Sequence, residues 1–283
     1  MARLWSSTLA VLLAAAPLWG QALHGSLVVW IVSERSDYVV IGAESRSVDS
    51  TERVVSDQDC KIISLGGDTL FCETGSREIA STRRASWNSL ATARSIYASS
   101  PNRDPVSLRN AWSEKAGQWL SRCSEQLVRQ LAHPPNGVIL FGGFINRGRN
   151  GTLSFCSEQL KYDPARHDIT GEPITAAPGQ VGASGRALGL VTEFIDGTTY
   201  RAIRARKLLV NVPALGIDPE KDAIVVRATI TFAMANAVGQ DKAELGGDID
   251  VAIIRNDRTI QWVARKPGCS REDYPPIGGT TFR

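Results

Sequence analysis

The chain has 283 residues, of which 43% are hydrophobic and 22% are charged, with 25 glycines and 13 prolines. This composition is ordinary for a globular protein, so collagen-like, disordered and coiled-coil classes are excluded. The net charge of +3 is too small to indicate a nucleic-acid-binding protein, and no nucleic-acid partner is predicted. Three histidines and five cysteines without a CxxC or HExxH motif argue against a metal enzyme, and no cofactor is predicted.

Residues 1–22 have the pattern of a secretory signal peptide. Arg3 precedes the apolar run Leu9 to Ala16, and Gly20-Gln21-Ala22 follows as a small-x-Ala cleavage site. The apolar run is too short to cross a bilayer. We therefore predict export, cleavage after Ala22, an extracytoplasmic (periplasmic or secreted) location and no stable membrane anchor after cleavage. The alternative is an uncleaved N-terminal anchor.

The next part of the chain alternates between strand-like and helix-like segments. Ser26–Val32 and Tyr38–Ala43 are apolar and β-branched and flank a short polar turn, which predicts a β-hairpin. A second hairpin is predicted around Gly66-Gly67-Asp68. Helix-forming residues without proline predict a helix over Ser76–Ala98. A stronger amphipathic helix is predicted between Pro105 and Pro134.

The second half of the chain continues this order of strands, helices and strands. The predicted elements are a hairpin from Gly137–Ile145 and Thr152–Phe155, helices over Ala187–Ile195, Tyr200–Val210 and Pro219–Val238, and a last hairpin from Asp250–Ile254 and Ile260–Val263. Two stacked, mainly antiparallel sheets with helices on both outer faces satisfy this order. No internal repeat or linker interrupts the order, which predicts a single domain.

Export permits disulfide bonds, and one pair of cysteines is placed symmetrically in the chain. Cys60 and Cys72 stand at equal distances from Gly66 in the predicted second hairpin. If the register is right, their side chains face each other, and we predict a disulfide between them. The pairing among the three other cysteines stays open; they are Cys123, Cys156 and Cys269.

The common catalytic signatures are absent from the sequence. The segment Gly182-Ala183-Ser184-Gly185 lacks the pattern of a nucleophile elbow, and no phosphate-binding glycine-rich loop occurs. A serine–histidine–aspartate triad would need His133 or His167, and both are predicted to be solvated. Any hydrolytic chemistry must therefore work without these arrangements.

One constellation near the N-terminus stands out. His24-Gly25-Ser26 opens a predicted strand, Ala43-Glu44-Ser45-Arg46 ends the next one, and Lys61 opens a third, with Gly75 lying 14 residues further on. Together with the pair Gly246-Gly247 before the last hairpin, this resembles the proteasome β-type family and its bacterial relatives, which are N-terminal-nucleophile hydrolases. The resemblance implies an α+β fold, a four-layer αββα sandwich. It also implies a possible homo-oligomer.

The resemblance implies a role for each residue. Ser26, exposed as a new N-terminus, attacks the substrate carbonyl and uses its own α-amino group as the base. Lys61 lowers the pKa of that amine, Glu44 orients Lys61, and the Gly75 backbone N–H contacts the oxyanion. Asp241 lies one position away from that of the family's aspartate that polarises the terminal amine, and Ser184 is a loose counterpart of the family's other serine, which lies in a Gly-Ser-Gly turn.

The sequence also departs from the family pattern. Its nucleophile is serine rather than threonine, Glu44 replaces an aspartate, and Lys242 and Leu245 occupy the positions of the supporting aspartate and serine. The predicted protein is an exported hydrolase that cleaves peptide amide bonds, with residues 23–25 as a short propeptide and 26–283 as one domain. Two alternatives stay open: a catalytically inactive binding or structural protein of the same fold, and an amidase for small molecules.

Overall fold

The computed structural model describes residues 22–25, 27–48, 53–79, 87–130, 138–163, 166–185, 215–238, 245–266 and 269. Several predictions concern residues outside these ranges. They are the signal peptide up to residue 21, Ser26, Asp241, and the helices expected over 187–195 and 200–210.

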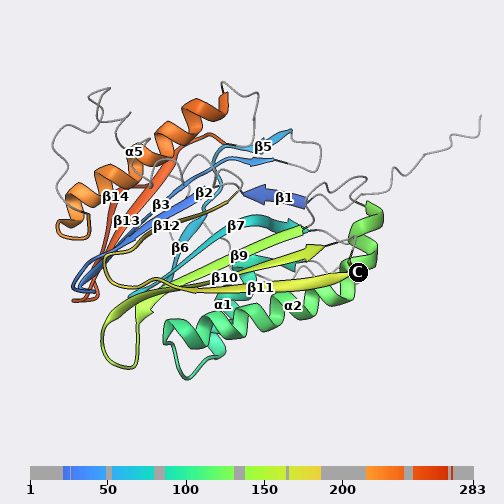
Figure 1. Cartoon of the computed structure of the whole chain (residues 1–283), viewed down its shortest axis with the longest axis horizontal. Helices are drawn as coiled ribbons and strands as arrows, with labels where there is room; N and C mark the ends of the chain where they lie inside the picture. Colours follow the sequence, from blue (N-terminus) through green and yellow to red (C-terminus); the bar gives the residue numbers. More distant parts are fainter. Residues whose placement is uncertain are drawn as a thin grey trace, which may run out of the picture.

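Two antiparallel sheets form the centre of the fold (Figure 1). The larger sheet has the strand order β11-β10-β9-β7-β1-β4-β5, with β6 and β8 also paired to β7. Its strands are β1 (Ala22–Gly25), β4 (Ser47–Val48), β5 (Val54–Ser56), β6 (Ile62–Gly66), β7 (Thr69–Ile79), β8 (Trp87–Asn88), β9 (Val138–Arg147), β10 (Leu153–Asp163) and β11 (Asp168–Thr175).

The smaller sheet has the order β12-β2-β3-β13-β14. Its strands are β2 (Leu27–Val32), β3 (Tyr38–Glu44), β12 (Val181–Gly185), β13 (Ile249–Arg255) and β14 (Ile260–Ala264).

Helices cover the outer face of each sheet. Helices α1 (Ser89–Ser99) and α2 (Pro105–Gln130) pack on the larger sheet, and α5 (Pro219–Val238) packs on the smaller one. A third cluster of apolar side chains fills the space between the sheets. The resulting layers are helix, sheet, sheet and helix, so the predicted four-layer αββα sandwich is confirmed. Among the described residues, no helix has the length and apolarity needed to cross a membrane.

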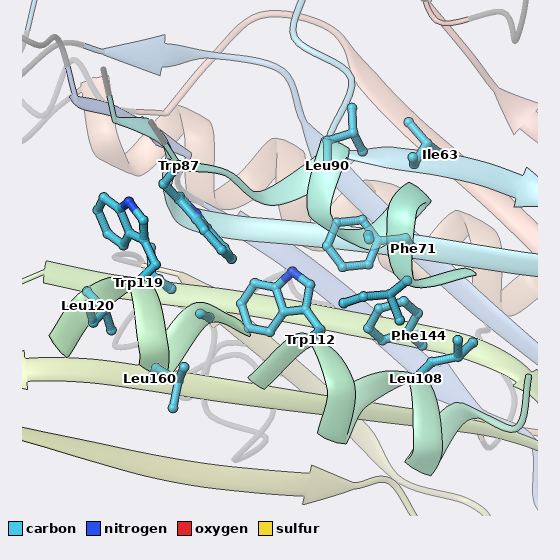
Figure 2. Packing of buried hydrophobic residues seen from close by; sticks show 14 of the residues in the cluster. Ile63, Phe71, Trp87, Leu90, Leu108, Trp112, Trp119, Leu120, Phe144 and Leu160 are labelled. Atoms are coloured by element: carbon cyan, nitrogen blue, oxygen red, sulfur yellow. The ribbon is translucent and has the colours of Figure 1, made fainter. Parts of the chain in front are cut away.

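Aromatic side chains dominate the core between α2 and the larger sheet (Figure 2). Trp112 is fully buried, and its ring lies 5.7 Å from the ring of Trp87 and 6.3 Å from that of Phe71. Gly142 on β9 makes room for it, because a Cβ atom there would lie 2.7 Å from the indole ring. The apolar spacing that predicted this helix thus reflects its contact with the sheet.

The predicted hairpins agree with the observed strand pairs β2–β3, β6–β7, β9–β10 and β13–β14. The helix predicted over Pro219–Val238 is also confirmed. The helix predicted over Ser76–Ala98 is wrong in its first part, because β7 continues to Ile79 and α1 begins only at Ser89. Pairing of β7 with β1 and β8 satisfies its backbone and overrides local helix propensity.

Candidate functional site

Gly25 and Leu27 belong to different sheets. Gly25 ends β1 in the larger sheet, and Leu27 begins β2 in the smaller one. Gly25 pairs with Gly75 on one side and with Ser47 on the other. Ser26 itself lies outside the described residues; its chain neighbours Gly25 and Leu27 lie at the junction of the sheets.

A buried carboxylate lies beside this junction. Glu44, at the end of β3, accepts hydrogen bonds from the backbone N–H of Leu27 at 3.2 Å, of Arg46 at 2.7 Å and of Gly246 at 3.4 Å. Its side chain is fully buried, and these donors compensate for the loss of hydration. The segment after Ser26 is therefore bonded directly to Glu44.

Lys61 is the charged partner of Glu44. Its Nζ donates to Glu44 Oε1 and, at 2.6 Å, to the carbonyl oxygen of Arg46, and only 1% of its side chain is exposed. Lys61 stands just before β6, and its own carbonyl accepts from Glu73 N at 3.0 Å. The Lys61 ammonium group is therefore desolvated and does not extend to the surface, as long lysine side chains usually do.

The segment that carries Lys61 is fixed to the end of β3 by further polar contacts. Arg46 binds Asp57 through Nε at 2.6 Å and Nη2 at 3.1 Å, a bidentate geometry. The hydrogen bond from Arg46 lowers the pKa of Asp57. The backbone N–H of Asp59 donates to Ser45 O at 3.1 Å. These bonds hold Lys61 and Glu44 in one rigid unit.

A second buried lysine, which no sequence pattern identified, contacts the segment that carries Lys61. Lys266 lies 3.0 Å from Asp250 Oδ2, and its Nζ donates to Asp59 O at 2.6 Å. Burial lowers the pKa of Lys266, although Asp250 opposes this shift. The one available signal was Asp250 itself, a carboxylate within the otherwise apolar run Ile249–Ile254 of β13.

The predicted disulfide between Cys60 and Cys72 is wrong. Cys60 is bonded to Cys269, 209 residues away, and Cys72 is a buried free thiol. In the register of β6 and β7, Cys72 faces Ile62 and not Cys60. Cys72 points into the core between the sheets, whereas Cys60 belongs to the core on the helix side. The sulfur atoms of Cys60 and Cys72 therefore lie on opposite faces of the sheet.

Gly75 lies inside β7, and not directly before a helix as the helix predicted over Ser76–Ala98 implied. It pairs with Gly25 and with Leu140 and has a φ of 78°. A Cβ atom at this position would lie 2.2 Å from the carbonyl oxygen of Ile139. Both the backbone conformation and the neighbouring strand thus require glycine here.

We expect Gly75→Ala to lower the free energy of unfolding by at least about 2 kcal/mol, because alanine disfavours a positive φ and has no space. Gly117→Ala in α2 is the matched control. No atom lies within 4 Å of its added methyl group, so it should raise stability by roughly 0.5–1 kcal/mol. Urea denaturation measures both. Equal stability of the two variants would contradict the assignment of Gly75 to a strained, closely packed position.

Ser184 lies at the same end of the sandwich. Ser184 is buried in β12, and the residue after it, Gly185, pairs with Leu27. The Ser184 hydroxyl lies 3.4 Å from that of Thr74, the residue before Gly75. Thr74 is a second polar side chain that the sequence did not single out. Asp241, the remaining predicted site residue, lies outside the described residues.

The described residues thus form an α+β protein with an αββα sandwich and a buried lysine–glutamate pair at the junction of its sheets. Solved structures with similarity to the chain include Anbu (ancestral beta-subunit) from Yersinia bercovieri, with 11% identity, 85% of this chain and 88% of that chain covered, and a TM-score of 0.47. The Anbu complex from Pseudomonas aeruginosa, described as a helical assembly, has 10% identity, 81% of each chain covered and a TM-score of 0.48. Eukaryotic HslV from Trypanosoma brucei has 20% identity, 81% and 99% covered, and a TM-score of 0.41. No protein-family model matches the sequence, and the curated proteins compared with it give no match.

Proposed function

We propose that the chain is an exported N-terminal-nucleophile hydrolase that cleaves peptide amide bonds with Ser26. The observation that carries the proposal is the contact between Leu27 N and Glu44, the carboxylate that also holds Lys61. An ammonium group fixed next to residue 26 favours the neutral form of an α-amine there. The α-amino group has a reference pKa of about 7.7–8.0, so it serves as a base near neutral pH without histidine.

The proposed maturation begins from the chain that starts at Leu23. The Ser26 hydroxyl attacks the carbonyl carbon of Gly25, and the acyl group moves from nitrogen to oxygen. Water then hydrolyses the ester, which releases the carboxylate of Gly25 and leaves Ser26 with a free amine and a free hydroxyl. The Gly75 N–H is the proposed donor to the oxyanion, a contribution of typically about 100- to 1000-fold in rate.

The proposed reaction with substrate repeats this chemistry on an external amide. The free amine of Ser26 takes the hydroxyl proton, and the hydroxyl oxygen attacks the carbonyl carbon of the substrate. The amine product leaves with a proton, and water hydrolyses the acyl-serine. Export agrees with the Cys60–Cys269 bond, since disulfides persist in oxidising compartments.

The decisive measurement is intact mass with N-terminal sequencing of protein recovered from its native compartment. We expect the wild-type chain to begin at Ser26, Ser26→Ala to stop at Leu23, and Ser26→Thr to mature because it keeps a hydroxyl. Cleavage of peptide-amide substrates should follow maturation. A wild-type chain that retains residues 23–25 would reject the mechanism and favour an inactive protein of this fold. Mature protein that cleaves only small amides would favour the amidase.

A further inference from the structure

A second candidate site lies at the opposite end of the sandwich. A cavity of about 290 Å³ opens between the β6–β7 turn, the α1–α2 loop, the β9–β10 turn and the β13–β14 turn. Strand β6 runs from Ile62, next to Lys61, to Gly66, next to this cavity. In Figure 1 the β9–β10 and β13–β14 turns lie at the left, away from the junction near β1.

The cavity is strongly basic. Four arginines and two aspartates line it, so its walls carry a net charge of +2. The aspartates neutralise only part of this charge, since Arg149 lies 3.6 Å from Asp104 and Arg258 lies 3.5 Å from Asp68. Asp104 is also engaged by Ser107, whose N–H and hydroxyl donate to it at 3.0 Å and 2.7 Å.

The two other arginines have no carboxylate within ion-pair distance among the described residues. The guanidinium of Arg103 stacks on the ring of Tyr97 at 4.4 Å, which fixes its orientation. Arg147, on the last position of β9, has its Nε shielded from solvent, and that atom donates to no group in the described part of the chain. Neither guanidinium group is therefore neutralised by a carboxylate in the described part of the chain.

The backbone conformation of Arg258 also supports a binding role for this cavity. Arg258 has a φ of 74°, a conformation that favours glycine in a hairpin turn. The turn nevertheless places a long cationic side chain there, and that side chain lines the cavity. Residues in this conformation cluster at ligand-binding sites, although the turns at Ser36 and His167 also contain them.

We propose that this cavity binds a phosphoryl group, either as free phosphate or on a small phosphate monoester. Guanidinium groups bind phosphate oxygens by paired charge-assisted hydrogen bonds, and a dianion matches the net charge of +2. Arg147 and Arg103 supply donors that have no carboxylate partner, and Asn102 and Asn146 add neutral polar groups to the walls. This site is independent of the proposed hydrolase chemistry, because no residue is shared between them.

The test is isothermal titration calorimetry of the protein as recovered from its native compartment, with inorganic phosphate and, separately, with glycerol 3-phosphate, at constant ionic strength set with chloride. We expect saturable binding at millimolar concentrations or below. Arg147→Gln should weaken binding at least tenfold, and Arg147→Lys should weaken it less. Stronger binding of one probe identifies the source of the phosphoryl group.

Arg166→Gln is the matched control, because Arg166 is an exposed arginine beside the β10–β11 turn and does not line the cavity. Its binding should equal that of the wild type. Arg258→Gln provides a second cavity variant if Arg147 variants fail to fold, and it should also weaken binding. The proposal is overturned if neither probe gives saturable binding, or if Arg166→Gln reduces binding as much as the cavity variants.

Discussion

Lys61→Met is expected to lower the rate of peptide-amide cleavage at least about 100-fold, the low end of the contribution of a general base, because the α-amine of Ser26 loses the ammonium group that favours its basic form. The same substitution should lower the free energy of unfolding by about 3–5 kcal/mol, because it leaves the Glu44 carboxylate buried without its cationic partner. Fluorogenic cleavage assays and urea denaturation measure the two effects.

A double variant separates the catalytic effect from the structural one. Lys61→Met with Glu44→Gln removes both charges, and we expect most of the lost stability to return, since neutral replacement of a buried ion pair is often tolerated. Activity should stay low, because the ammonium that favours a neutral α-amine is still absent. A double variant with activity near that of the wild type would show that the pair is only structural.

Reduction of the Cys60–Cys269 bond is expected to cost up to about 5 kcal/mol of stability, because it releases a closed loop of 209 residues in the unfolded chain. For a chain of this size the melting temperature should fall by roughly 10–20 °C. Thermal unfolding with and without a reductant measures the effect, and Cys60→Ala with Cys269→Ala should match the reduced wild type.

Cys72→Ala is the control for this prediction. It removes a buried thiol but leaves the disulfide, so the variant should remain as sensitive to the reductant as the wild type. Loss of that sensitivity would mean that Cys72 takes part in the bond in solution, and would favour the pairing within the β6–β7 hairpin.

The parts of the fold that were predictable depend on contacts between residues close in the chain. The turn at Gly66-Gly67 and the alternation around it predict the β6–β7 hairpin because both strands and their connection lie in one short segment. Register was harder to predict, because the observed pairing is shifted by two residues and joins Ile62 to Cys72. Cys60 precedes β6, so its side chain does not follow the alternation of that strand and lies in the core on the helix side. Short-range patterns therefore predict the strands but not their exact starts and register.

The unpredicted parts depend on distant segments. Lys266 reaches Asp59 across 207 residues, and no periodicity marks either of them. Strand β11 is largely exposed and polar, so it lacks the apolar alternation that identifies a strand, yet it pairs with β10 over its full length. The contact between Glu44 and Lys61 followed only from the resemblance, because no local pattern relates two residues on different strands.

The position of β1 has a consequence for the proposed maturation. β1 lies in the middle of the larger sheet, with β4 on one side and β7 on the other. If residues ahead of Ser26 are cut off and leave, the backbone groups of both neighbours lose their partners, and a slot one strand wide opens next to the nucleophile. An extended peptide can fill such a slot by main-chain hydrogen bonds alone, with its scissile bond at the end where Gly25 had been. The substrate would thus occupy the place of the cleaved segment. Extended peptides would bind better than compact amides, because only an extended backbone forms these hydrogen bonds.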